Sequence, residues 1–116
     1  MRKTLFVASV ALLLSMTLRA QTALKKVYDE KANPIEQIDK ALQKAVREDK
    51  FVICQVGGNW CPWCLRFADF IAKDAAISKV VNENFVFIHT NYNPRNNVDN
   101  PQAKQAEQLM KMLGHP

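Results

Sequence analysis

The chain has 116 residues, enough for a single domain, and its 16 Lys and Arg residues outnumber 11 Asp and Glu residues, for a formal net charge of +5. Three of the basic residues and none of the acidic ones lie in residues 1–20, which leaves +2 for residues 21–116. No basic run remains there, so the composition argues against nucleic acid or an anionic membrane surface as a partner.

Residues 1–20 have the pattern of a secretory signal peptide. Arg2 and Lys3 form a charged start, residues 5–18 are uncharged and mostly apolar, and Ala20 is a candidate cleavage position. The apolar stretch is shorter than the roughly 20 residues that span a bilayer, although an uncleaved anchor is an alternative. We therefore expect an exported protein in an oxidising compartment, periplasmic or secreted, with no membrane attachment after cleavage.

Residues 21–33 are expected to form an extended N-terminal arm, and residues 34–116 to form the domain. Asn33 and Pro34 predict a helix start, as N-cap and first helical residue, with Glu36 placed to reach back. Apolar residues at helical spacing extend this helix to about Asp49. They are Ile35, Ile38, Leu42, Ala45 and Val46.

Two apolar runs predict parallel strands. Residues 51–56 and 85–90 are rich in β-favouring residues, and both are expected to be buried on two sides. Between them, Pro62 begins a helix that is expected to bend or break at residues 74–76 and to end at a left-handed Asn84. Strands that alternate with helices in this way predict a right-handed βαβ unit and an α/β fold.

The segment after the second strand predicts a surface loop and a last helix. Four asparagines and Pro94 lie in residues 92–100, and Asn100-Pro101 repeats the N-cap and proline signal. Apolar residues at helical spacing line this helix, which Gly114 is expected to end. They are Ala103, Ala106, Leu109, Met110 and Leu113.

The most specific motif is Trp60-Cys61-Pro62-Trp63-Cys64, at the junction of the first strand and the next helix. Two cysteines three apart can close a small disulfide ring, and helix N-terminal amides stabilise a thiolate at the first one. This arrangement favours reversible thiol–disulfide chemistry. A static structural disulfide is one alternative, although so small a ring contributes little stability.

Half of a zinc site is the other alternative for the cysteine pair. The remaining candidate ligands are Cys54, His89 and His115, which form no second closely spaced pair, so we predict no metal site. Cys54 lies inside the first strand and is expected to be a buried small hydrophobe. A third redox thiol is the alternative, and would require Cys54 to face the site.

On the strand, the Trp-Cys-x-x-Cys motif, the second strand and the Asn93-Pro94 loop, residues 28–114 resemble the thioredoxin-fold family. Residues 57–64 and 74–88 look most like its exported thioredoxin-like members. The resemblance implies a thioredoxin-like fold with the catalytic pair Cys61, the exposed nucleophile, and Cys64, the more buried resolving cysteine. It implies protein thiols and disulfides as substrates, a redox partner protein and no cofactor.

The same resemblance suggests roles for the residues around the pair. Pro62 would fix the loop, Trp60 and Trp63 would shield the disulfide, and all three would bind substrate. Trp63 could instead be a simple packing residue. Arg66 would either add positive charge near Cys61 or be a solvated surface residue.

The chain departs from the family pattern in two respects. Gln55 stands where thioredoxins carry a buried aspartate, and Phe87 falls near the usual lysine, so proton transfer would need water, His89 or a backbone-stabilised thiolate. The family fold also continues with a proline loop, a β-hairpin and a helix, so the domain is expected to be incomplete at its C-terminus. A redox-inert binding module and a non-functional fragment of a longer redox protein are therefore the alternative functions.

Overall fold

The computed structural model describes residues 23–93 and 100–115. The expected signal peptide, residues 1–20, and most of the asparagine-rich loop lie outside the described residues. The elements are α2 (Pro34–Glu48), β1 (Phe51–Gly57), α3 (Pro62–Lys73), α4 (Ala75–Asn84), β2 (Phe85–Asn91) and α5 (Pro101–Met112).

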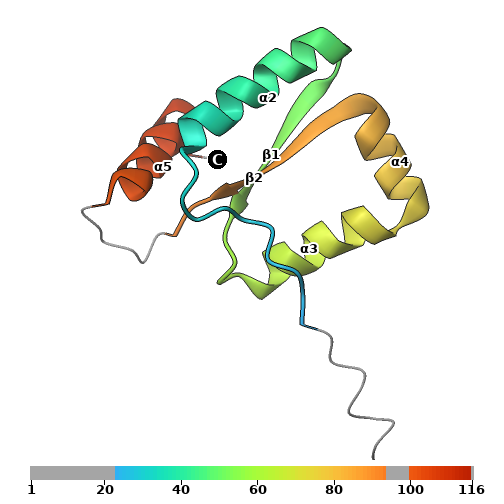
Figure 1. Ribbon diagram of the computed structural model, residues 1–116, viewed down its shortest axis with the longest axis horizontal. Coiled ribbons are helices and arrows are strands. Elements are labelled where there is room, and N and C mark those ends of the chain that lie inside the picture. Colours follow the sequence, from blue (N-terminus) through green and yellow to red (C-terminus); the bar gives the residue numbers. More distant parts are fainter. Residues whose placement is uncertain (1–22, 94–99, 116) are drawn as a thin grey trace, which may run out of the picture.

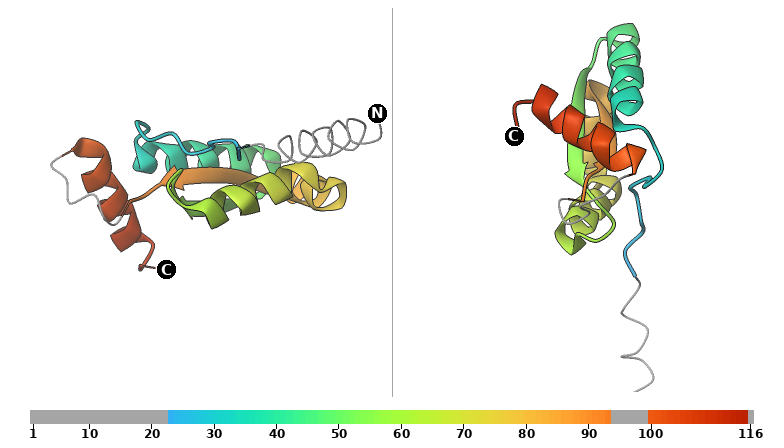
Figure 2. Two further views of the ribbon diagram at one scale, coloured as in Figure 1. Left: turned by 90° about the horizontal axis from the view of Figure 1, so that it is seen from below. Right: turned by 90° about the vertical axis from the view of Figure 1, so that its left-hand side faces the viewer.

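The two strands pair in parallel, with Phe51 opposite Phe85 and Gly57 opposite Asn91. The α3–α4 crossover joins them, which confirms the predicted βαβ core and the thioredoxin-like α/β fold. Helix α2 lies on one side of the strands and α3 and α4 on the other (Figures 1 and 2). Because the strands are parallel, both end at the same edge of the sheet, and the cysteine motif begins at this edge.

Helix α2 begins as predicted, and Ala45 is the buried member of its predicted apolar spacing. The Asn33 side chain accepts hydrogen bonds from the N–H groups of Ile35, at 2.9 Å, and Glu36, at 3.3 Å. The buried residues of the helix include Ala41 and Ala45, which form a core cluster with Val86 of β2. Small side chains let a helix pack closely against a sheet. Because the two alanines face the sheet, the bulkier residues that follow them in α2 face outward.

Leu42 and Val46 are those bulkier residues, although the sequence places them at the same helical spacing as Ala45. Leu42 is 50% exposed and Val46 is 83% exposed. Each follows a buried alanine by one position, and one helical residue corresponds to a rotation of about 100°. Their side chains therefore lie at the side of the helix rather than beneath it.

The break between α3 and α4 falls where the sequence predicts it. Asp74 ends α3 and caps α4, with its carboxylate accepting a hydrogen bond from the Ile77 N–H at 3.0 Å. The predicted left-handed Asn84 is wrong, because α4 includes Asn84 and the next residue, Phe85, is already extended. The chain thus enters β2 without a loop that a left-handed residue would have to turn.

The strands are less buried than predicted. Phe51 is 77% exposed, and residues 52–56 are half-buried. In β2, the buried residues are Val86, Thr90 and Asn91. The reason is that, within residues 23–93 and 100–115, each strand has a single neighbour, so side chains at its outer edge meet solvent.

Helix α5 is confirmed, with the predicted cap and end. The Asn100 side chain accepts a hydrogen bond from the Ala103 N–H at 2.7 Å, and Gly114 follows the helix with φ of 77°. Leu109 is 1% exposed, and the helix packs against α2. Neither α5 nor any other described helix has the length and apolar character needed to cross a bilayer.

Candidate functional site

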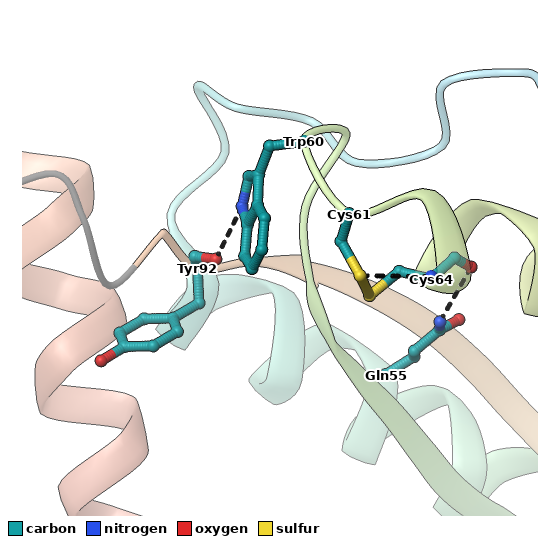
Figure 3. Close-up of a disulfide and its surroundings, with 5 residues drawn as sticks. All are labelled: Gln55, Trp60, Cys61, Cys64 and Tyr92. Carbon is teal, nitrogen blue, oxygen red and sulfur yellow. Dashed lines mark hydrogen bonds between the residues drawn. A yellow bond between two sulfur atoms is a disulfide. The ribbon is translucent and has the colours of Figure 1, made fainter.

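The cysteine pair lies at the start of α3, after a short loop that follows the carboxyl end of β1 (Figure 3). Cys61 is the N-cap of the helix, and its sulfur accepts a hydrogen bond from the Cys64 N–H at 3.2 Å. The two residues form a disulfide, with their Cα atoms 5.3 Å apart. Because helix N-terminal N–H groups stabilise negative charge, this geometry favours a thiolate at Cys61 when the disulfide is open.

The residues between and beside the cysteines are exposed. Trp60 is 45% exposed, and its indole N–H donates a hydrogen bond to the Tyr92 carbonyl at 3.2 Å (Figure 3). Pro62, the first residue of α3, is also exposed. Cys61 and Cys64 are both half-buried.

Trp63 is 74% exposed, so the interpretation of this residue as simple packing is wrong. The Arg66 guanidinium lies over the Trp63 ring, 4.8 Å from its centroid. Such a cation–π contact holds an exposed indole in place. Arg66 is exposed, as expected of a surface residue.

Gln55 lies beside the pair, at the position where thioredoxins carry an aspartate. Its side-chain N–H donates a hydrogen bond to the Cys64 carbonyl at 3.1 Å (Figure 3), and its side-chain oxygen is buried without a partner among the described residues. An amide does not titrate, so Gln55 fixes the backbone of Cys64 but exchanges no proton with it.

His89, opposite Gln55 in the sheet, is half-buried. Its ring lies 5.1 Å from the Phe87 ring and 5.4 Å from the Tyr28 ring, centroid to centroid. Burial lowers the pKa of His89 below its ordinary value, and Nε2 has no hydrogen-bond partner in the described residues. Both Phe87 and His89 line a pocket of 260 Å³ against residues of α3 and α4.

The N-terminal arm contributes two contacts to the site that the sequence analysis missed. The Asn59 side chain accepts a hydrogen bond from the Tyr28 N–H at 3.1 Å and donates one to the Tyr28 carbonyl at 2.8 Å. Tyr28 is 4% exposed, although it lies in a segment predicted to be a polar arm. Its aromatic side chain among polar residues is the one local signal that could have indicated burial.

Cys54 is half-buried rather than buried as expected, because it lies on a sheet with two described strands. Its sulfur lies 3.2 Å from the Thr90 hydroxyl oxygen, at hydrogen-bond distance. Burial raises the pKa of the Cys54 thiol, which the Thr90 contact offsets in part. In the described residues, no group of three or more His, Cys, Asp or Glu side chains is arranged to hold a metal ion.

A family model named Thioredox_DsbH and described as "Protein of unknown function, DUF255" matches residues 17–116. The chain belongs to this family. Membership in the Thioredox_DsbH family, together with the joined cysteines, indicates a thiol–disulfide redox role, with protein thiols and disulfides as the general substrate class. Neither the curated proteins nor the solved structures include a significant match to the chain.

Proposed function

We propose that the protein is an exported thiol–disulfide oxidoreductase that exchanges electrons between the Cys61–Cys64 pair and protein partners. The observation that carries this proposal is the disulfide at the start of α3, in which the sulfur of Cys61 accepts a helix N–H. The N–H groups at the start of the helix stabilise a thiolate at Cys61. A stabilised thiolate is both a good leaving group and the form in which a cysteine acts as a nucleophile.

The proposed reaction begins when a partner thiolate attacks the Cys61 sulfur. A partner–Cys61 disulfide forms, the Cys61–Cys64 bond breaks, and its electron pair moves to the Cys64 sulfur. The partner's second thiolate then attacks the partner sulfur of that mixed disulfide and releases the Cys61 thiolate. The partner loses two electrons and the pair gains them; the same steps in reverse reduce a partner disulfide.

Trp60, Pro62 and Trp63 are the proposed substrate-binding residues. They are exposed around the pair, and Trp60 and Trp63 are each held by a directed contact, to Tyr92 and Arg66 respectively. Rigid, exposed indoles offer a large apolar contact area at a small cost in conformational entropy. This supports their role in binding an unfolded or flexible segment around a partner cysteine.

Export is proposed from the charged and apolar pattern of residues 1–20. An oxidising compartment, periplasmic or extracellular, would supply partners whose cysteines exchange with the pair. Mass spectrometry of the protein recovered from a cell fractionation tests this part directly. A chain that begins at residue 21 in the periplasmic or external fraction supports export, and an intact residue 1 in the cytosol contradicts it.

The redox role is tested by trapping partners with single cysteine variants, each carrying Cys54→Ala. Cys64→Ser leaves the mixed disulfide at Cys61 unresolved, so covalent complexes that dithiothreitol releases should accumulate. The matched variant Cys61→Ser removes the nucleophile and should capture few or none. Equal covalent capture by both variants would contradict the assigned roles.

A redox-inert binding module is the second candidate function. It is favoured by the exposure of Phe67 and Phe70 on α3, at 50% and 53%, next to Trp63. Binding of an unfolded polypeptide that is unchanged when both cysteines are replaced by serine would support this candidate. If the variant with both cysteines replaced by serine no longer binds the polypeptide, the result would support the oxidoreductase.

A further inference from the structure

The side chain of Tyr28 is a buried polar group of the site that the proposed reaction does not use. It comes from the arm and is 4% exposed. Its hydroxyl is buried and has no hydrogen-bond partner among the residues that the structure describes. A buried hydroxyl without a partner destabilises the fold, so its position calls for an explanation.

Gly57 places this hydroxyl beside the disulfide. A Cβ atom added to Gly57 would lie 2.7 Å from the Cys64 sulfur and 2.9 Å from the Tyr28 hydroxyl oxygen. Both atoms therefore lie close to the Cα of Gly57, and any larger residue at position 57 would collide with both. The absence of a side chain at residue 57 is what lets the arm reach the resolving cysteine.

The position of Tyr28 is fixed from two directions. Asn59 binds both its N–H and its carbonyl, which ties the arm to the loop that precedes Cys61. The His89 ring makes an edge contact with the Tyr28 ring, at an interplanar angle of 78°. The hydroxyl is thus pre-organised, with little freedom to find another partner.

We propose that Tyr28 is a positioning residue whose hydroxyl donates a hydrogen bond to the Cys64 sulfur when the disulfide opens. The inference rests on the proposed function and names a group that stabilises its leaving thiolate. In the opening step, the electron pair of the broken S–S bond moves to Cys64, and the Tyr28 hydroxyl, which lies next to Gly57 as the Cys64 sulfur does, turns its O–H toward the new negative charge. Tyr28 would thus supply polar support to Cys64 at a site where Gln55 replaces the usual carboxylate.

Tyr28 keeps its proton throughout this step. Burial, and next the nearby Cys54 thiol, raise the pKa of Tyr28 to about 12, so the phenol is a weaker acid than a thiol. Cys64 would then take its proton from solvent. The role is stabilisation by a hydrogen bond, which charged acceptors strengthen, rather than proton transfer.

The test measures the pKa of Cys64 directly, in the full chain carrying Cys54→Ala and Cys61→Ser, so that one thiol remains. The rate of iodoacetamide alkylation is followed against pH, with far-UV circular dichroism as the check on folding. Tyr28→Phe removes the hydroxyl alone and should raise the pKa of Cys64 by about one unit, a tenfold change in its ionisation constant. Tyr92→Phe, the matched loss of the other tyrosine hydroxyl, should leave the pKa of Cys64 unchanged.

A pKa of Cys64 that Tyr28→Phe leaves unchanged would overturn the inference. If Tyr28→Phe does not fold, 3-fluorotyrosine is incorporated at Tyr28 in the Tyr92→Phe chain; its more acidic phenol should lower the pKa of Cys64, and no decrease overturns the inference. The proposed function is judged separately, by whether the unaltered Cys61–Cys64 pair is reduced and reoxidised reversibly. Failure of the inference about Tyr28 is therefore distinguishable from failure of the proposed redox function.

Discussion

Directed contacts hold the carboxyl end of the sheet, whereas the amino end relies on the packing of Ala41 and Ala45 against Val86. At the carboxyl end, residues 57–64 are fixed by a disulfide, by the two Asn59–Tyr28 hydrogen bonds and by the Trp60–Tyr92 contact. At the amino end, Val46 and Phe51 are 83% and 77% exposed, and α4, which leads into β2, has no buried residue. The geometry of the site therefore depends more on directed contacts from the arm than on the packing of the helices far from it.

The largest expected effect comes from cutting the arm away from the site. Asn59→Ala leaves the N–H and carbonyl of Tyr28 without partners, and should lower the free energy of unfolding by about 2 to 3 kcal/mol. Asn82→Ala, on exposed α4, removes an amide contact to Ser78 and should cost less than about 0.5 kcal/mol. Urea denaturation of both variants makes the comparison, and equal costs would contradict the contrast between the two ends.

A substitution at Gly57 tests the close approach under the disulfide. The new methyl of Gly57→Ala would collide with the Cys64 sulfur and the Tyr28 hydroxyl, so the arm or α3 must move. Overpacking of this kind costs about 1 to 3 kcal/mol. A midpoint of urea denaturation indistinguishable from the unaltered chain would show that the two groups have room to move apart.

Two valines sharpen the comparison away from the site. Val86→Ala removes a side chain that packs on Ala41 and Ala45, and should cost about 1 to 2.5 kcal/mol, whereas the exposed Val46→Ala should cost about 0.5 kcal/mol or less. The midpoints of urea denaturation measure both. A cost for Val46→Ala as large as that for Val86→Ala would mean that the outer face of α2 is covered in solution.

The smallest effect is a pH dependence from His89. Because burial lowers its pKa in the folded state below the ordinary 6.5, the unfolded chain takes up a proton at higher pH than the folded chain does. The free energy of unfolding should therefore decrease as the pH falls through 6.5 and level off once the folded His89 is protonated too. Denaturation at a series of pH values measures this, and His89→Gln should flatten the curve; an unchanged slope in that variant would assign the effect to another group.

Local chemistry accounts for what could be predicted from the sequence. Asn33-Pro34 and Asn100-Pro101 marked helix starts, and Asp74 marked a helix break, because a cap is satisfied by backbone N–H groups two or three residues away. The position of Cys61 at a helix start follows in the same way from Pro62 and the strand before it. Each of these features depends on a few neighbouring residues.

Contacts between distant residues account for what could not be predicted. Tyr28 and Asn59 are 31 residues apart, and nothing in either segment indicates the other. On α2, the predicted Ala45 packs in the core cluster but Leu42 and Val46 do not, because the distance from the helix to the sheet decides which side chains fit. The predicted strand burial failed for a similar reason, since it depends on how many strands lie side by side.

The measurement that tests the central claim most directly is a redox titration of the chain in glutathione buffers. Free thiols are alkylated and counted by mass spectrometry, with Cys54→Ala as the control for the third cysteine. The account predicts a reversible two-thiol transition at Cys61 and Cys64 that Cys54→Ala leaves in place, and its midpoint gives the direction in which the pair drives its partners. No reversible transition, or random pairing that includes Cys54, would contradict the claim that these residues form a redox site.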